Sequence, residues 1–231
     1  MTAHVLSVNV GSAEPNGAKT TPTGIRKRPI DSVEVRAPGP KHGGRGSGVI
    51  GDFIGDRDNH GGDFQAVYAV AREELDWWGS RLGRALHPGM FGENLTTTGI
   101  DVDHALIGER WQVGAEVVLT VRGPRIPCGT FAQHMGERGW LKTFVAHGLS
   151  GAYLSVEVPG TIRTGDPITV LSTPDHGVQV PTVFRAFYGD VDALRAVVAE
   201  PVLDPVEHAA LSRRLVEELT RRAGSASRGA S

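Results

Sequence analysis

Residues 116–128 read EVVLTVRGPRIPC, and this stretch decides how the rest of the chain is interpreted. Its first six residues have the apolar and polar alternation of a strand, and Gly123 followed by Pro124 ends that strand. Pro127 fixes the backbone directly before Cys128, and apolar residues after the cysteine recur at helical spacing. The sequence therefore predicts a strand, a rigid connection and a helix, with Cys128 where the connection meets the helix.

Similar short strands are predicted on both sides of this stretch. The chain holds 31 Gly and 14 Pro, which interrupt helices and mark turns between strands. Two helical insertions are expected, at 72–82 and after Cys128. The further strands are predicted at 4–10, 32–36, 65–70, 110–113, 152–158 and 167–171. The fold class predicted is mainly β with α, a β-barrel or sandwich with helical insertions.

The composition changes near Pro174, after which glycine becomes rare and helical spacing takes over. Helices are predicted at 181–188 and 191–199. A third begins at Asp204-Pro205-Val206-Glu207, where an N-cap acid and a proline at the first helical position favour a helix start. Its charged face is interpreted as solvated rather than as a nucleic-acid-binding arm. The expected units are a β domain over 1–173, a three-helix extension over 178–223 and a disordered tail over 224–231.

The whole-chain composition excludes several classes of protein. With 231 residues, 39% of them hydrophobic, and a formal net charge of -2, the chain can build a core but has no cation excess for nucleic acid. Its one cysteine cannot form an internal disulfide, which suits a reducing cytoplasm. No signal peptide and no apolar run of membrane-spanning length are visible. We therefore expect a cytoplasmic protein with neither a membrane nor a nucleic acid as its partner.

Three groups of residues are candidates for chemistry. The predicted helix start and the neighbouring Arg125 favour the thiolate of Cys128, although an isolated cysteine is usually a small buried hydrophobic residue. The segment GDFIGDRDNHGG at 51–62 is typical of a polar loop, but its acids and imidazole can also exchange protons. The segment MFGENLTT at 90–97 adds an acid and an amide, which are also common in turns.

Several short motifs occur in order along the chain. They are TGIRKRP at 23–29, GD at 51–52, HGG at 60–62 followed by AVY at 66–68, FGENL at 91–95, IGE at 107–109 and PRIPC at 124–128. In this order and spacing they resemble the MOSC domain family, and most closely its YiiM-like bacterial branch with a helical C-terminal extension. The resemblance runs from the first strand to about Leu171, and 180–222 resembles the extension.

This resemblance implies a MOSC-type β-barrel that binds a molybdenum cofactor (molybdopterin), with the Cys128 thiolate as the ligand of molybdenum. It implies reduction of N-hydroxylated small molecules, such as N-hydroxylated bases and amidoximes, to amines and amidines. The implied proton-handling group is His60, Glu93 and either Asp52 or Asp56. The residues implied in cofactor binding are Arg125, Asn94, Lys27, Arg28, Gly61 and Gly62, whose cations suit the pterin phosphate.

The chain shows no flavin, nicotinamide or iron–sulfur motif, so electrons would come from a separate flavoprotein or ferredoxin-like protein. A homodimer is left open. No candidate for chemistry lies beyond residue 180, so the extension is expected to serve dimerisation or donor binding and to be dispensable for the site.

The sequence also departs from the family pattern. Asp63-Phe64-Gln65 stands where the family usually has Pro-Asp-Lys, Leu149 lies where an arginine is expected, and Ala152 where tryptophan is common. Three other functions remain open: a non-catalytic carrier of cofactor or persulfide on Cys128, a cysteine hydrolase using Cys128, His60 and Glu93, and a zinc site drawn from the nine histidines.

Overall fold

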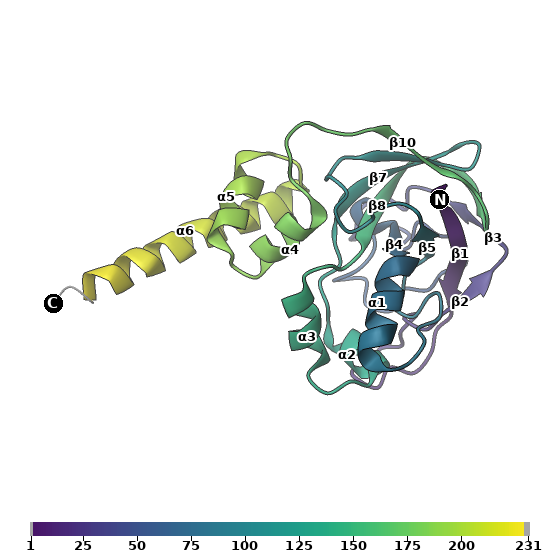
Figure 1. Ribbon diagram of the computed structural model, residues 1–231, viewed down its shortest axis with the longest axis horizontal. Coiled ribbons are helices and arrows are strands. Elements are labelled where there is room, and N and C mark those ends of the chain that lie inside the picture. Colours follow the sequence, from purple (N-terminus) through teal and green to yellow (C-terminus); the bar gives the residue numbers. More distant parts are fainter. Residues whose placement is uncertain (1, 229–231) are drawn as a thin grey trace.

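The computed structural model describes residues 2–228, with side chains described for 2–223. The larger part of the molecule is a curved sheet flanked by helices, and the C-terminal helices project from one side of it (Figure 1). The strands are β1 (His4–Gly11), β2 (Lys27–Ile30), β3 (Ser32–Val35), β4 (Val67–Ala71), β5 (Leu95–Thr98), β6 (Arg110–Val113), β7 (Val117–Pro124), β8 (Ala152–Val158), β9 (Gly160–Arg163) and β10 (Ile168–Ser172). The helices are α1 (Arg72–Leu82), α2 (Gly129–Met135), α3 (Trp140–His147), α4 (Val180–Phe187), α5 (Val191–Ala199) and α6 (Pro205–Arg228), and a short 3-10 helix, Asp63–Gln65, precedes β4.

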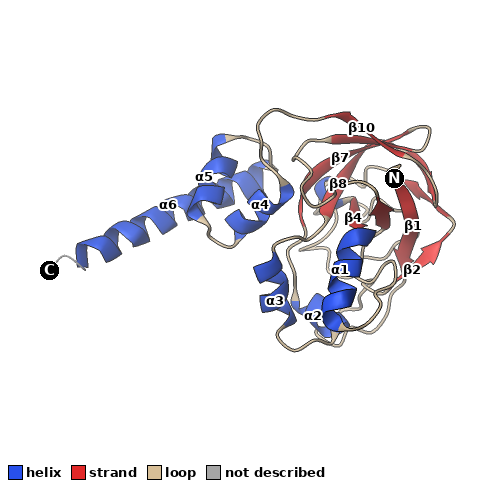
Figure 2. Ribbon diagram, viewed as in Figure 1, coloured by secondary structure: helices blue, strands red, loops and turns tan. Residues whose placement is uncertain are grey.

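The main sheet has eight strands in the order β10-β6-β7-β8-β4-β5-β1-β2, and β3 pairs with β9 in a separate two-stranded sheet. Neighbouring strands run antiparallel except β4 and β5, which are parallel. Figure 2 shows α1, α2 and α3 gathered beside the sheet and α4, α5 and α6 beyond it. The predicted class, mainly β with helical insertions and a C-terminal helical extension, is confirmed.

The expected barrel is not closed. β2 and β10 lie at the two edges of the sheet, and β2 covers only the second half of β1, from Val8 to Gly11. The first residues of β1 meet the start of β10 through hydrogen bonds from Val5 N–H to the Asp166 carbonyl (2.9 Å) and from Ile168 N–H to the Ala3 carbonyl (2.9 Å). These few contacts curl the sheet without forming a continuous ladder.

Two groups of buried side chains hold the fold together. Mostly aliphatic residues of the sheet form the first, which also takes in Val183 and Leu194 of the C-terminal helices. The second is an aromatic cluster in which α1, α2, α3 and α4 meet, and its members include Trp78, Phe91, Phe131, Trp140, Phe144 and Phe184. Cys128 packs against the rim of this aromatic cluster, so the cluster fixes the place of the candidate site.

The last C-terminal helix, α6, begins as its capping residue predicts. The Asp204 carboxylate accepts hydrogen bonds from the backbone N–H groups of Val206 (2.8 Å) and Glu207 (3.3 Å), which caps α6. The backbone of α6 continues beyond the expected limit at 223 to Arg228, so five residues of the predicted tail, 224–228, are helical, and 229–231 lie outside the described residues.

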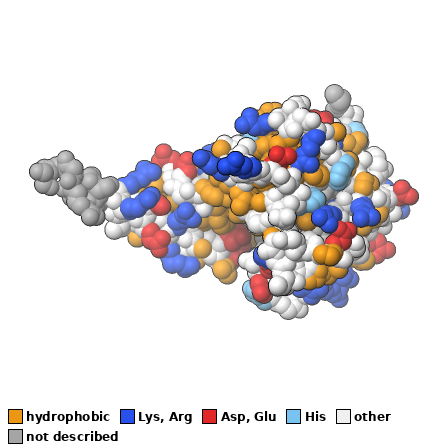
Figure 3. Space-filling view, turned by 90° about the horizontal axis from the view of Figure 1, so that it is seen from below, with side chains coloured by type: hydrophobic (Ala, Val, Ile, Leu, Met, Phe, Trp, Pro, Cys, Tyr) orange, Lys and Arg blue, Asp and Glu red, His pale blue; other side chains and the backbone are white. Residues whose placement is uncertain are grey.

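Figure 3 shows basic and acidic side chains intermixed over this extension, which fits a solvated face. No helix among the described residues combines the length and apolar character needed to cross a membrane.

Candidate functional site

Cys128 stands where strand β7 gives way to helix α2. The strand ends at Pro124, and Cys128 has extended backbone (φ -130°, ψ 172°) directly before the first residue of α2. Phe131 and Met135 of α2 are buried in the aromatic cluster, which anchors the helix. The strand, rigid connection and helix predicted from the sequence are thus all present, and they hold the half-buried thiol at a fixed edge of the core.

Two hollows meet at Cys128, and we call them the inner arm and the outer arm. The inner arm has a cavity volume of about 110 Å³, and its lining includes Lys27, Asp52, Asn94 and Arg125. The outer arm is lined by Lys19, Lys41, Phe64, Arg122, Phe187 and Glu207, among others. Both arms share Asp56, His60, Gln65, Cys128 and Tyr153. The cysteine therefore faces a ligand-sized cavity from the junction of its two branches.

The surroundings of Cys128 favour its thiolate. Burial raises the pKa of the thiol, but a hydrogen bond from His60, the charge of Arg125 and the backbone amide of Phe131 outweigh it and lower the pKa to about 6. At neutral pH the residue is therefore mostly ionised, which is the nucleophilic and metal-binding form. The buried-hydrophobe interpretation does not account for this placement.

The pKa of Cys128 can be measured in protein free of cofactor. Because the thiolate is the reacting form, the rate of alkylation by iodoacetamide is expected to rise with pH around a midpoint near 6 and to level off above it. His60→Ala removes a group that lowers this pKa, so its midpoint is expected to move upward. An ordinary cysteine midpoint in the unsubstituted protein would contradict the electrostatic description.

Arg125 is a buried cation with spare hydrogen-bonding capacity. Its guanidinium carbon lies 3.6 Å from the centre of the Phe131 ring and 5.7 Å from that of Tyr68. The side chain is buried, and its Nη1 atom has no hydrogen-bond partner. A buried donor of this kind costs free energy unless a ligand satisfies it. Arg125 thus offers the inner arm a positioned cation suited to an anionic group.

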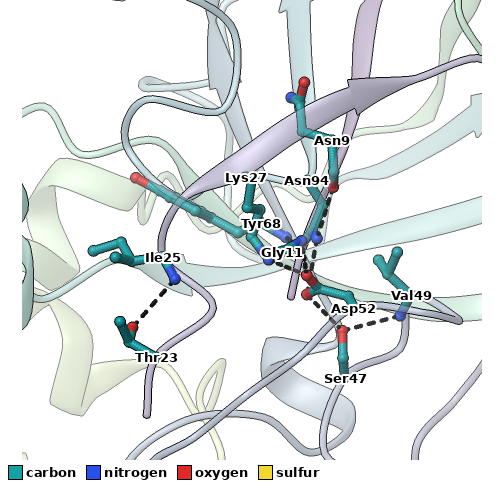
Figure 4. A network of polar contacts seen from close by, with 10 residues as sticks. All are labelled: Asn9, Gly11, Thr23, Ile25, Lys27, Ser47, Val49, Asp52, Tyr68 and Asn94. Atoms are coloured by element: carbon teal, nitrogen blue, oxygen red, sulfur yellow. Dashed lines mark hydrogen bonds and ion pairs between the residues drawn. The ribbon is translucent and has the colours of Figure 1, made fainter. Parts of the chain in front are cut away.

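A second buried cation, Lys27, is tied into a polar network at the base of the inner arm (Figure 4). Its ammonium pairs with Asp52, and the two side chains are 7% and 2% exposed. Asp52 also accepts hydrogen bonds from Gly11 N–H (2.8 Å), Ser47 Oγ (3.1 Å) and Asn94 Nδ2 (3.1 Å). Four donors occupy the carboxylate, so Asp52 orders the base of the arm and has no free position for exchanging a proton.

Asn94 connects this network to the neighbouring strand. Its Oδ1 accepts from the Tyr68 backbone N–H (3.2 Å), while its Nδ2 donates to the Asn9 carbonyl (3.3 Å) as well as to Asp52. The side chain lines the inner arm, as expected of a cofactor-binding residue, but its own hydrogen bonds already hold it to the protein.

Asp56 lies at the junction of the two arms and differs from Asp52 in exposure. Its carboxylate pairs with Lys19 at 2.5 Å, and the two side chains are 22% and 43% exposed. The hydrogen bond from Lys19 lowers the pKa of Asp56, so this acid is ionised at neutral pH. Of the two aspartates that the sequence left open, Asp56 is the one in contact with solvent beside His60.

Glu93 requires a correction, because it is fully buried and lines neither arm. Its carboxylate accepts from the backbone N–H groups of Gly89 and Phe91 and from the hydroxyl of Thr96. Burial raises the pKa of Glu93, and these hydrogen bonds oppose the increase. Glu93 thus stabilises the turn before β5. It does not contact the cavity, so it cannot exchange a proton with a ligand bound there.

Arg28 also lies outside both arms. Its side chain is 80% exposed and pairs with Glu14 at 3.3 Å, so of the two neighbouring cations only Lys27 reaches the cavity. Gly61 lines the inner arm, whereas Gly62 does not. Both have positive φ (91° and 81°), and a Cβ atom at either would lie 2.7 Å from backbone atoms of Gly46 or Lys41. These glycines are required by the tight loop that places His60.

Two alternative functions lose their geometric basis. A Cys128–His60–Glu93 triad is not assembled, because the turn at 89–92 separates Glu93 from the cavity. Among residues 2–228, no group of three His, Cys, Asp or Glu side chains comes together in a way that could hold a metal ion. The zinc alternative therefore has no ligand set in that part of the chain.

Sequence reasoning missed the two tyrosines of the site. Tyr68 and Tyr153 are direct neighbours on β4 and β8, with ring centres 5.1 Å apart, and both line the inner arm. Burial raises the pKa of each phenol, so both remain protonated donors. The Tyr68 hydroxyl donates to the Ser150 carbonyl (2.6 Å). The available signal was a tyrosine in each of two short strands, but strand pairing was needed to bring them together.

The three departures from the family pattern differ in their position. Gln65 lines both arms and accepts from Gly61 N–H (3.2 Å), so a lysine lost there would be lost from the site. Ala152 is buried in β8, and Leu149 lines a different hollow beside Glu73 and His104. The missing arginine near Leu149 therefore removes no cation from either arm.

Comparisons with known proteins identify relatives over most of the chain. The model of the MOSC domain family matches residues 56–169. The uncharacterized protein YflK of Bacillus subtilis is 32% identical over 196 residues, which cover 84% of each chain. A protein of Gibberella moniliformis named Reductase is 31% identical over 136 residues, which are 55% of this chain and 23% of that protein.

Solved structures share the fold. The crystal structure of YiiM from Geobacillus stearothermophilus has a TM-score of 0.72 and 24% identity, and the match covers 92% of this chain and 99% of that chain. YiiM from Escherichia coli gives a TM-score of 0.67 with 20% identity and 94% coverage of both chains.

Proposed function

Since this chain belongs to the MOSC domain family, we propose that it binds a molybdenum cofactor through Cys128 and reduces N-hydroxylated small molecules to amines or amidines. The observation that carries the proposal is the placement of Cys128, where a thiolate meets both arms of a cavity with the buried cations Arg125 and Lys27 in one of them. The relative named Reductase supports an oxidoreductase role in the family.

The residues of the inner arm fit a cofactor that carries both a soft metal and an anionic group. Cys128 would hold the metal, because a thiolate is a soft donor. Arg125 would bind the pterin phosphate with its unpartnered Nη1, and Lys27 adds positive charge at the base of the same arm. Arg28, exposed and outside the arm, is not retained for this role.

Reduction of an N–OH group to N–H consumes two electrons and two protons and releases water. When bound, the cofactor would supply an oxygen acceptor and the electron pair. His60, beside the Cys128 thiolate, is the residue that delivers a proton to the departing oxygen. The neutral Tyr153 hydroxyl can hold the substrate N–OH group by a hydrogen bond. Asp56, which lines the cavity together with His60, is the solvent-accessible acid of this group.

A direct test is to produce the protein in cells that synthesise the cofactor, and to measure molybdenum per chain and reduction of benzamidoxime with an artificial reductant. Bound molybdenum together with benzamidine formation is the expected result. Molybdenum without turnover would favour the carrier alternative, and absence of both would overturn the proposal. Activity with an added flavoprotein or ferredoxin-like donor would then identify the electron source.

The proton-delivery role of His60 gives a separate prediction. His60→Ala is expected to keep its molybdenum but to lower turnover by about 10²-fold, because a positioned acid contributes about that much to the rate. The measurement is molybdenum content and kcat on the same preparation. If the variant loses its molybdenum instead, His60 belongs to cofactor binding rather than to proton delivery.

A further inference from the structure

The C-terminal helices form part of the cavity at Cys128. Phe187, the last residue of α4, and Glu207, in the first turn of α6, line the outer arm opposite residues of the sheet domain. This contradicts the expectation that nothing beyond residue 180 reaches the site. Phe187 and Glu207 line the outer arm together with Cys128 and do not line the inner arm.

Helix α4, which carries Phe187, is held firmly against the sheet domain and forms one wall of the outer arm. Ile107 N–H donates to the Val178 carbonyl (3.0 Å), and Val180 N–H donates to the Ala105 carbonyl (3.1 Å) at the start of α4. Val183 and Phe184 are almost completely buried in the two cores. A helix docked in this way presents Phe187 in a fixed position, so the wall is a permanent part of the outer arm.

Aromatic side chains give the outer arm a flat apolar surface. Phe64 is 37% exposed, and the Arg122 guanidinium carbon lies 5.1 Å from the centre of its ring. Phe187 is half-buried on the side of the C-terminal helices. Two phenyl rings and a stacked guanidinium favour a planar ligand, because flat rings pack on aromatic faces with little loss of conformational entropy.

Glu207 adds a polar contact that the protein itself does not use. Its side chain is half-buried, and within residues 2–223 no group donates a hydrogen bond to its carboxylate. Burial raises the pKa of Glu207, and the nearby Lys41 opposes the increase. A partly desolvated acceptor gains free energy when an N–H donor of a ligand reaches it.

We propose that the outer arm is the substrate arm and that Phe187 and Glu207 select planar N-hydroxylated compounds with a second hydrogen-bond donor opposite the N–OH group. This inference rests on the proposed function, because it places the N–OH end at Cys128. The ring then lies along Phe64 and Phe187, and the donor at the far edge reaches Glu207. The C-terminal helices are therefore part of substrate recognition.

The test compares the binding of 4-aminobenzamidine and benzamidine by calorimetry to the full-length protein from cofactor-producing cells. The two ligands differ only in the donor at the far edge of the ring. The unsubstituted protein is expected to bind 4-aminobenzamidine about tenfold more tightly, the effect of one added hydrogen bond. Glu207→Ala should abolish this preference, and Phe187→Ala should weaken both ligands about tenfold.

Matched controls lie on the same helices. Glu217→Ala changes an exposed acid of α6, and Tyr188→Ala changes an exposed aromatic residue next to Phe187, and neither residue lines the arm. Both are expected to bind like the unsubstituted protein. Equal affinity for the two ligands, or a preference that survives Glu207→Ala, would overturn the assignment. Molybdenum content distinguishes the two proposals, since metal-free protein that keeps the Glu207-dependent preference would contradict the proposed function alone.

If Phe187→Ala is poorly folded, the Glu207→Gln variant tests whether the outer arm recognises the ligand. It keeps the size of the side chain and removes only its charge, and it is expected to reduce the preference for 4-aminobenzamidine by a smaller factor than Glu207→Ala. An unchanged preference in both Glu207 variants would show that the donor does not reach this residue.

Discussion

Cys128→Ser is expected to lose essentially all bound molybdenum and all reduction of N-hydroxylated compounds while the protein remains folded. Serine is close to cysteine in size, and Cys128 is only half-buried at the rim of the aromatic cluster, so the packing changes little. The hydroxyl, however, does not ionise at neutral pH and is a hard donor, whereas the metal requires a soft thiolate.

The measurement is molybdenum per chain and benzamidoxime turnover, accompanied by the thermal unfolding midpoint. An unchanged midpoint with no metal is the expected combination. Full metal content and turnover in the serine variant would remove Cys128 from the role of ligand. A variant that becomes insoluble would instead indicate a structural role for the thiol.

Asp52→Ala is expected to lower the free energy of unfolding by about 3–5 kcal/mol, the usual effect of removing one partner of a buried ion pair. Lys27 would be left as a buried cation, since the side chains of the pair are 7% and 2% exposed. Gly11 N–H, Ser47 and Asn94 would also lose an acceptor. With a total stability of about 5–15 kcal/mol, such a loss is large.

Asp56→Ala is the matched control for this prediction. It also breaks a lysine–aspartate ion pair of the same loop, but this pair is exposed to solvent. The Lys19 and Asp56 side chains are 43% and 22% exposed, so its effect on stability is expected to be small. Urea unfolding followed by tryptophan fluorescence measures both variants. Equal stability losses in the two would show that burial of the Lys27–Asp52 pair contributes little.

The sequence predicted the regular elements well where a long apolar pattern or a strong local signal exists. Helix α1, strand β8 and helix α5 have the predicted bounds, and Asp204 caps α6 as its position implies. Strands β2 and β9 were missed because KRPI and GTIR hold too few apolar residues to show alternation, whereas the equally short β3 and β6, SVEV and RWQV, do alternate. Closure of the sheet depends on which edges meet, and no local pattern contains that information.

The residues around Cys128 in the candidate site could be predicted from the sequence, whereas the residues farther from the motifs could not. Cys128, His60, Arg125 and Lys27 lie together as the motif order suggested. Glu93 has the right chemistry but lies behind its own turn, because hydrogen bonds within the segment 89–96 use its carboxylate. Phe187 and Glu207 belong to a segment without any motif, and only the docking of α4 on the sheet brings them to the cavity.

The meeting of the first and last strands of the main sheet has a consequence for synthesis on the ribosome. The half of β1 that β2 leaves uncovered pairs with 165–168, through contacts such as Gly165 N–H to the Val5 carbonyl (2.8 Å). About 160 residues separate these partners, so at about 5–20 residues per second this edge stays open for roughly 8–32 s of translation. A nascent chain that stalls before Ile168 therefore exposes an unpaired strand edge to its neighbours.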